Sequence, residues 1–199
     1  MTTSRESEAG ISHSSEVQGV ERISYTPPRL VILCGAPCGG KTTTALEIAK
    51  RIHVVYIDKD SLQDPFTEER EGVVYQSVRE QTFQGMYNIA GQNILAGNSV
   101  IIDAPFDNID RWTSLQRWLP SLSQNSVKLK VIRCHASDTE IRRRMSERNS
   151  PRDKSKLDDW EEYRKKYPIM FNIPLPHIDL DTQKSLELVI QAALEYLAK

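Results

Sequence analysis

The chain has 199 residues and a formal net charge of −1 at pH 7, with 27% charged and 39% hydrophobic residues. This balance is typical of one globular domain with a full core, and it argues against a bulk basic field that would recruit nucleic acid. No apolar run approaches the ~20 residues of a membrane span, and the amino terminus lacks the apolar core of a secretory signal. We therefore expect a cytoplasmic protein without membrane contact.

The first segment, residues 1–28, is rich in Ser, Thr and Glu and ends in Pro27-Pro28. It has no clear apolar period, which favours a flexible extension ahead of a single domain over residues 29–199. A docked segment that uses Val17, Val20, Ile23 and Tyr25 is the alternative.

A phosphate-binding motif follows the first predicted strand, Leu30–Cys34, and opens a predicted helix, Lys41–Arg51. The pattern G-x-x-x-x-G-K-T is filled by Gly35, Ala36, Pro37, Cys38, Gly39, Gly40, Lys41 and Thr42, and Thr43 comes next. Backbone N–H groups of such a loop point at phosphate oxygens, and the helix N-terminus adds about half a positive charge. We expect Lys41 to reach the β- and γ-phosphates and Thr42 to ligate Mg²⁺. Cys38 is either a tolerated small residue or a thiolate stabilised by the helix N-terminus.

Strands and helices alternate from Leu30 onward, which predicts an α/β fold with a parallel sheet covered on both faces. The further predicted strands are Val54–Ile57, Ser99–Ile102, Leu129–Cys134 and Ile178–Leu180. The further predicted helices are Val73–Leu95, Ile109–Leu119, Asp138–Glu147 and Lys184–Leu197, with an exposed helix within 153–167. Function is expected where the strands end at their carboxyl termini.

Two predicted strands end in carboxylates. The second runs into Asp58-Lys59-Asp60, and a carboxylate there can accept the proton of an acceptor hydroxyl. We favour Asp60 for this role, with Asp58 as the alternative or as a group on the Mg²⁺ side. The third strand ends in Asp103, a Walker-B-like position suited to holding Mg²⁺ directly or through water.

Arginines are frequent after the fourth predicted strand, at positions 142, 143, 144, 148 and 152. Three adjacent arginines cannot share one helix face, whereas Arg144 and Arg148 are four residues apart and do. We interpret the segment at about 145–167 as a lid whose arginines close on the transferring phosphoryl group, with a solvated basic face as the alternative. The candidates for binding the acceptor, besides Asp60, are Phe66, Arg79, Phe106, Arg111 and Trp112.

Together these residues resemble the P-loop small-molecule kinases, a group that includes chloramphenicol phosphotransferase, adenylylsulfate kinase, gluconate and shikimate kinases and the kinase domain of polynucleotide kinase. The resemblance covers residues 29–199 in layout and is carried by Gly35–Thr42, Asp58–Asp60, Asp103 and Arg142–Arg152. It implies a three-layer P-loop NTPase fold with a five-stranded sheet of order 2-3-1-4-5, with ATP as donor and Mg²⁺ as cofactor. It also implies an adenine-contacting loop at about Asp181-Thr182-Gln183 and a lid arginine near the nucleotide.

The resemblance predicts an ATP-dependent kinase that acts on a hydroxyl of a small molecule such as an antibiotic, nucleoside or sugar. A GTPase switch is disfavoured because N-K-x-D is absent and Asp103 is followed by Ala104-Pro105-Phe106 rather than by D-x-x-G. A polynucleotide 5′-kinase, a toxin-like sugar-nucleotide kinase and a non-kinase ATPase stay open as alternatives. The oligomeric state stays open between a monomer and a homodimer.

Overall fold

The structure is a computed structural model that describes residues 27–67 and 73–199. The expected extension over residues 1–28 therefore lies almost wholly outside the described residues. None of the helices within the described ranges has both the length and the apolar character needed to cross a membrane.

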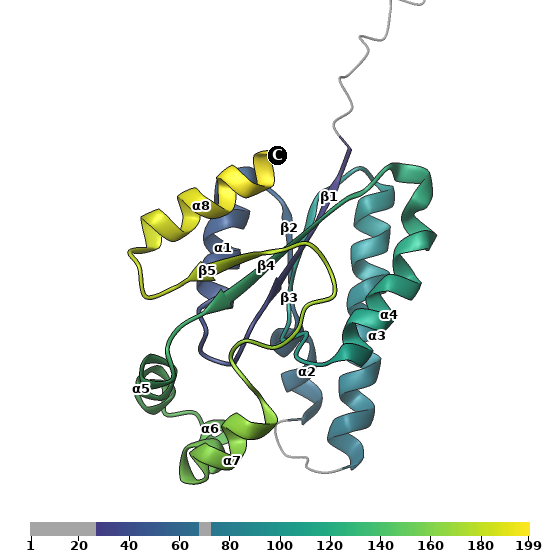
Figure 1. The fold of residues 1–199 in the computed structure, drawn as a ribbon. Helices are drawn as coiled ribbons and strands as arrows, with labels where there is room; N and C mark the ends of the chain where they lie inside the picture. Colours follow the sequence, from purple (N-terminus) through teal and green to yellow (C-terminus); the bar gives the residue numbers. More distant parts are fainter. Residues whose placement is uncertain (1–26, 68–72) are drawn as a thin grey trace, which may run out of the picture.

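The core of the molecule is a five-stranded sheet in which every pair of neighbouring strands is parallel (Figure 1). The strands are β1 (Arg29–Cys34), β2 (Val55–Asp58), β3 (Val100–Asp103), β4 (Lys128–His135) and β5 (Ile178–Asp181). Their order is β2-β3-β1-β4-β5, which confirms the expected arrangement. Asp58 and Asp103 are register partners at the carboxyl ends of β2 and β3, so the two carboxylates lie at the same edge of the sheet.

Helices cover both faces of the sheet and make the expected three layers (Figure 1). The helices are α1 (Lys41–Ile52), α2 (Lys59–Thr67), α3 (Val73–Leu95), α4 (Ile109–Trp118), α5 (Asp138–Arg148), α6 (Pro151–Asp158), α7 (Trp160–Lys166) and α8 (Leu186–Ala198), with a 3₁₀ helix over Leu119–Asn125. Helices α1 and α8 pack on one face, α3 and α4 pack on the other, and α5, α6 and α7 gather beyond the ends of the strands.

The two cores follow from the alternation of side chains along buried strands. In β1, Leu30 and Ile32 belong to the core under α3 and α4, whereas Val31 and Leu33 belong to the core under α1 and α8. All four side chains are fully buried, as expected for a central parallel strand. This burial holds β1 in the centre of the sheet, and therefore sets the position at which the loop after Cys34 begins.

The structure differs from the sequence prediction in three places. The residues after β2, for which no helix was predicted, form helix α2, so Asp60 lies in the first turn of a helix. The 3₁₀ helix over Leu119–Asn125 was not predicted. The single exposed helix expected within 153–167 is two helices, because Asp159 leaves helical geometry with φ −124° and ψ 61°.

Candidate active site

The P-loop connects β1 to α1 in a shape that requires glycine at two positions. Gly35 has φ 135°, and a Cβ added there would lie 2.1 Å from the backbone oxygen of Cys134. Gly40 has φ 88°, and its Cβ would lie 2.8 Å from Thr182. Gly35 therefore allows close approach to the backbone of β4, and Gly40 allows a left-handed backbone directly beside the Thr182 side chain.

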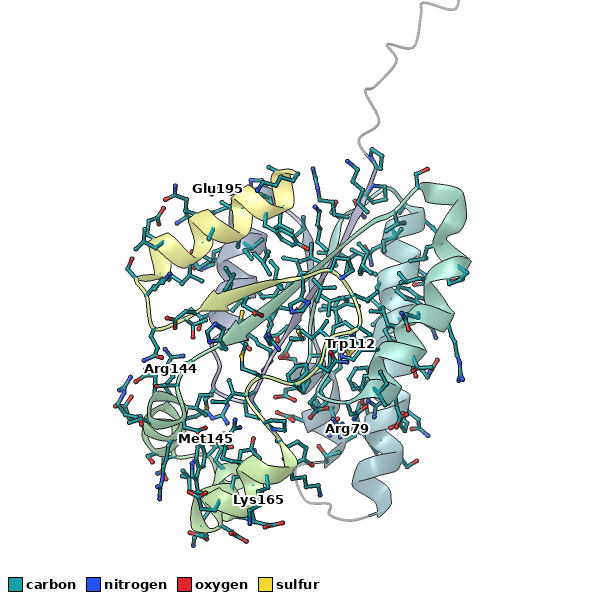
Figure 2. All side chains as sticks on the ribbon, in the orientation of Figure 1. Arg79, Trp112, Arg144, Met145, Lys165 and Glu195 are labelled. Carbon is teal, nitrogen blue, oxygen red and sulfur yellow. The ribbon has the colours of Figure 1, made fainter. Side chains whose placement is uncertain are left out.

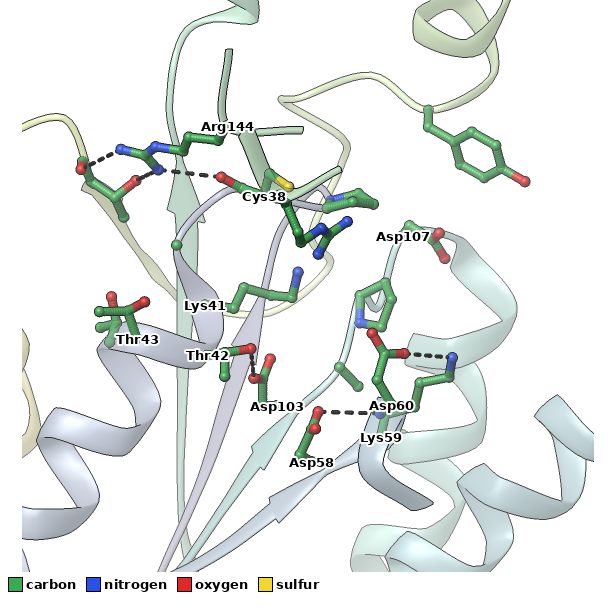
Figure 3. Close-up of a pocket in the computed structure, with 18 of the residues that line it drawn as sticks. Cys38, Lys41, Thr42, Thr43, Asp58, Lys59, Asp60, Asp103, Asp107 and Arg144 are labelled. Carbon is green, nitrogen blue, oxygen red and sulfur yellow. Dashed lines mark hydrogen bonds and ion pairs between the residues drawn. The ribbon is translucent and has the colours of Figure 1, made fainter. Parts of the chain in front are cut away.

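Lys41, the first residue of α1, extends its side chain back over the loop. Its Nζ donates hydrogen bonds to the backbone oxygens of Gly35 and Ala36, both at 3.1 Å. An ammonium group has three donors, so the P-loop carbonyls use only part of its capacity. Figure 3 shows the Lys41 ammonium directed into the pocket above Thr42 and Asp103. The placement fits the predicted contact with the β- and γ-phosphates.

Thr42 and Asp103 form an oxygen-rich pair next to Lys41. The Thr42 hydroxyl donates to Oδ2 of Asp103 at 2.7 Å, and the Tyr56 hydroxyl donates to the same oxygen at 3.2 Å. Burial raises the pKa of the Asp103 carboxyl, while Lys41 and the bond from Thr42 act in the opposite direction. Mg²⁺ prefers such hard oxygen ligands and takes its remaining ligands from phosphates and water. The pair therefore fits Mg²⁺, even though no group of three or more His, Cys, Asp or Glu suited to a metal occurs in the described ranges.

The two carboxylates after β2 have different surroundings. The oxygens of Asp58 accept bonds from the backbone N–H groups of Asp60 and Ser61 and from the Ser61 hydroxyl, at 2.6 to 3.1 Å. Asp58 thus caps the start of α2. Asp60 is 45% exposed, and its Oδ1 accepts a bond of 2.9 Å from the nearly buried Lys59 ammonium. Asp60 is consequently the more accessible carboxylate of the two.

Arg144 connects three separate segments of the chain. Its guanidinium donates to Glu140 at 2.7 Å, to the Cys38 backbone oxygen at 3.2 Å and to the hydroxyl and backbone oxygens of Thr182 at 2.9 Å. The Thr182 hydroxyl in turn donates toward Gly39 O at 3.0 Å. Arg144 therefore joins α5, the P-loop and the loop after β5, where the adenine contact was expected (Figures 2 and 3).

The neighbouring arginines of α5 point elsewhere, as their spacing required. Arg142 lies 5.8 Å from the ring centroid of Trp160, and Arg143 pairs with Glu140 and Glu147 on the exposed surface. The side chain of Arg152, the last arginine of the predicted cluster, is outside the described part of the structure.

Arg148, the last residue of α5, is bound by Asp153 of α6, whose side chain is only 1% exposed. Asp153 accepts a bond of 2.8 Å from Nε of Arg148 and another of 2.8 Å from Lys156. Although burial acts to raise it, the pKa of Asp153 is held below its usual value by the bonds from Lys156 and Arg148. One buried carboxylate therefore fixes two cations that both line the pocket.

The five predicted contacts to the acceptor outside Asp60 are placed differently from one another. Arg79 lines the pocket and pairs with Asp107 at 3.2 Å. Phe106 and Trp112 are both fully buried, with their rings 5.0 Å apart, and Arg111 is buried in a two-bond pair with Glu80. Phe66 is 63% exposed. Of the five, only Arg79 lines the pocket, because the other four side chains are committed to the core, to Glu80 or to solvent.

One pocket of about 620 Å³ is lined by P-loop residues and by the following charged side chains: Asp58, Asp60, Arg79, Asp103, Arg144 and Arg148. Figure 3 shows Thr42 and Thr43 on the left of the pocket, Asp60 and Asp107 on its right, and Asp103 and Asp58 side by side below. Sequence reasoning did not assign the pocket-lining residues Lys59, Asp107, Lys156, Tyr163, Tyr167 and Lys184 to the site. A signal was available for Asp107, which follows β3 closely, but none was available for Tyr163 and Tyr167 because only folding brings them to the pocket.

Cys38 also lines the pocket, with φ 58° and a half-buried thiol. Burial raises the pKa of this thiol, and the opposing effect of Arg148 does not offset it. Of the two interpretations of Cys38, the structure favours the tolerated small residue over the stabilised thiolate.

Comparisons with known proteins agree with this geometry. A family model described as "AAA domain" matches residues 30–168, whereas no curated protein matches the chain. Similar solved structures include a sugar kinase from Janibacter sp. HTCC2649 (TM-score 0.66, 19% identity, 86% of this chain and 95% of that chain). A Mycobacterium tuberculosis APS kinase in complex with AMPPNP and APS has TM-score 0.64 and 14% identity, over 87% of this chain and 99% of that chain.

A gluconokinase from Sinorhizobium meliloti 1021 is also similar, with TM-score 0.60 and 18% identity over 86% of this chain and 92% of that chain. At these identities the similarity concerns the fold alone. The family match, by contrast, covers more than half of the sequence. The chain therefore belongs to the AAA domain family and has the fold of the P-loop small-molecule kinases.

Proposed function

We propose that the protein is a phosphotransferase that moves the γ-phosphate of ATP to a hydroxyl group of a small molecule. The observation that carries the proposal is one pocket lined both by the P-loop lysine and by Asp60, an accessible carboxylate in the first turn of α2, just after the edge strand β2. A nucleotide switch or a mechanical ATPase needs the P-loop, but neither needs that carboxylate beside a space for a second substrate.

The donor side of the proposed reaction uses the P-loop and its neighbours. The loop N–H groups and Lys41 bind the phosphates, and Thr42 with Asp103 are the residues that would hold Mg²⁺. The metal would neutralise charge on the phosphate oxygens when bound. Thr182, fixed by Arg144 and by Gly39, lines the same pocket and would contact the nucleotide.

The acceptor side uses Asp60. A carboxylate in this position accepts the proton of the attacking hydroxyl and aligns the oxygen with the γ-phosphate. The Lys59 ammonium fixes the orientation of Asp60 through Oδ1. The bonds that Asp58 accepts at the start of α2 support Asp60 over Asp58 as the base.

The negative charge that develops on the transferred phosphoryl group is stabilised best by cations that the protein holds in position before the reaction. Arg148 and Lys156 line the pocket from the lid, and both are bound to buried Asp153. Arg148 lines the same pocket as Cys38 of the P-loop and the proposed base Asp60. We assign charge stabilisation to Arg148 and nucleotide binding to Arg144.

An ADP-release assay tests the proposal, with the purified protein, Mg²⁺-ATP and panels of antibiotics, nucleosides and sugars. We expect acceptor-dependent ADP formation. We also expect Mg²⁺-ATP at ~100 times its Kd to raise the melting temperature by about 5–10 °C through preferential binding to the folded state. No shift at millimolar Mg²⁺-ATP, together with no ADP release, would contradict the proposal.

Replacing Arg144 by lysine should raise the KM for ATP about tenfold, because an ammonium cannot replace the fork that joins Cys38 O to Thr182. The turnover number should change much less. Arg143→Lys is the matched control: Arg143 is the neighbouring residue of the same helix, its side chain is 54% exposed, and lysine keeps the charge that pairs with Glu140 and Glu147. Steady-state kinetics at varied ATP concentration measure both KM values. Equal KM values for ATP in the two variants would mean that Arg144 does not contribute to nucleotide binding.

A further inference from the structure

The end of the pocket next to Asp60 carries two ion pairs. Lys59 pairs with Asp60 at 2.9 Å, and Arg79 pairs with Asp107 at 3.2 Å. In the first pair the carboxylate is 45% exposed and the ammonium 6%. In the second pair both side chains are largely buried, and both residues line the pocket. This region therefore offers hydrogen-bond donors and acceptors with little net charge.

The Arg79–Asp107 pair has unused bonding capacity. Within the described ranges, the guanidinium of Arg79 donates one bond, from Nη2 to Oδ1 of Asp107. Buried Arg111 is different, because two of its nitrogens are bound by Glu80. Asp107 also accepts a long bond of 3.4 Å from Asn108, again through Oδ1. The remaining N–H groups of Arg79 and Oδ2 of Asp107 can serve a ligand in the pocket.

Flat side chains border the same space. Tyr163 of α7 and Tyr167, the residue that follows this helix, line the pocket with ring centroids 5.3 Å apart. Ala104 and Pro105, which follow β3, line the same pocket, as do Arg79 and Asp107. A ligand bound here would contact the apolar surfaces of these residues and the Arg79–Asp107 pair, which can both donate and accept hydrogen bonds.

We infer that the acceptor is a neutral polyhydroxy compound, a sugar or sugar alcohol, that binds through adjacent hydroxyls to the Arg79–Asp107 pair. This inference rests on the proposed kinase function and adds the substrate class. One hydroxyl of the compound lies at Asp60 and receives the phosphoryl group: its oxygen forms the new bond to γ-phosphorus, its proton goes to Asp60, and the bond from γ-phosphorus to the ADP oxygen breaks.

The argument against a charged acceptor is the cost of like charges beside a largely buried pair. A carboxylate on the remaining N–H groups of Arg79 would place a second negative charge next to Asp107, and an ammonium on Oδ2 of Asp107 would place a second positive charge next to Arg79. Hydroxyls each donate and accept one bond or more, so they add bonds to the pair without separating it. Because Arg79 and Asp107 are largely buried, the difference in binding free energy between a neutral and a charged acceptor is large.

The test is an ADP-release panel arranged in matched sets: glucose, glucuronate and glucosamine; sorbitol and gluconate; ribose and myo-inositol. We expect a neutral member to exceed its charged counterparts in kcat/KM by tenfold or more. A preference for a charged member would overturn the inference. The inference would also be overturned if no neutral polyol were phosphorylated. In that case the kinase proposal would still stand if Mg²⁺-ATP raised the melting temperature and a non-sugar acceptor were phosphorylated.

Asp107→Asn then tests the pair itself, with the preferred neutral acceptor. The variant keeps one acceptor oxygen but loses the charge, so the KM for the acceptor should rise at least tenfold while kcat and the KM for ATP change less than twofold. Asp110→Asn, on the exposed start of α4, is the control and should change none of these values. Arg79→Lys, which keeps the charge, should give a smaller rise than Asp107→Asn. An unchanged acceptor KM in a folded Asp107→Asn protein would refute the assignment.

Discussion

Replacing Lys41 by alanine is expected to lower the turnover number by roughly 10²- to 10³-fold, the usual loss when one preorganised group that stabilises transition-state charge is removed. The Lys41 ammonium lies over the P-loop, 3.1 Å from two of its carbonyl oxygens, and it alone brings a full positive charge from within the G-K-T motif. The fold should persist, because the glycine geometry and the buried strand β1 form the loop without this side chain. Single-turnover and steady-state ADP formation measure the loss, and circular dichroism checks the fold.

Lys50→Ala serves as the control for Lys41→Ala. Lys50 lies on the same helix and pairs with Glu47 on the surface, with 68% of its side chain exposed. We expect wild-type kinetics from it, since exposed pairs of this kind contribute about 0–1 kcal/mol to stability. Near wild-type turnover by Lys41→Ala would mean that the P-loop does not bind the transferred phosphate.

Replacing Asp60 by asparagine should leave the affinity for ATP intact and reduce phosphorylation of the acceptor by about 10²-fold or more, the range lost with a general base. The amide has nearly the same shape but cannot take the proton of the attacking hydroxyl. It also loses the charge that pairs with Lys59, so the melting temperature must be measured beside the kinetics. ATP binding can be followed by calorimetry, independently of turnover.

Asp58→Asn separates the two carboxylates. Asparagine still caps a helix well, so the start of α2 should be retained and the kinetic effect should be milder or appear as a changed Mg²⁺ dependence. If Asp58→Asn is inactive and Asp60→Asn is active, the base has been assigned to the wrong residue. If both are active, neither carboxylate takes the proton.

Much of the fold could be predicted because local patterns and global packing agree. The apolar run after Pro28 predicts a strand, and β1 is buried on both faces. The apolar period between residues 73 and 95 predicts one helix, and α3 has those same bounds, with Met86, Ala90 and Ile94 fully buried. Helix α2 was missed because Pro65 and its polar residues resemble a turn, and the cap that starts it comes from Asp58 on the preceding strand.

The candidate site could be predicted only in part. Motif spacing indicated Lys41, Thr42, Asp60 and Asp103, which lie at or after the carboxyl ends of strands that meet at one edge of the sheet. Phe106 and Arg111 also follow β3, yet Phe106 turns into the core and Arg111 toward Glu80. Sequence distance from a strand end does not reveal which way a side chain points.

The sequence by itself determined the P-loop, the parallel sheet and the edge at which function lies, because these depend on short-range patterns: a glycine motif, apolar runs and the carboxylates that end them. Only the tertiary structure decided which partners each charged group has. Arg144 is bound to Thr182, Arg148 to Asp153 and Arg79 to Asp107. Ion pairs form between residues far apart in the chain or on different elements, so their geometry depends on how the layers pack, and no local pattern specifies it.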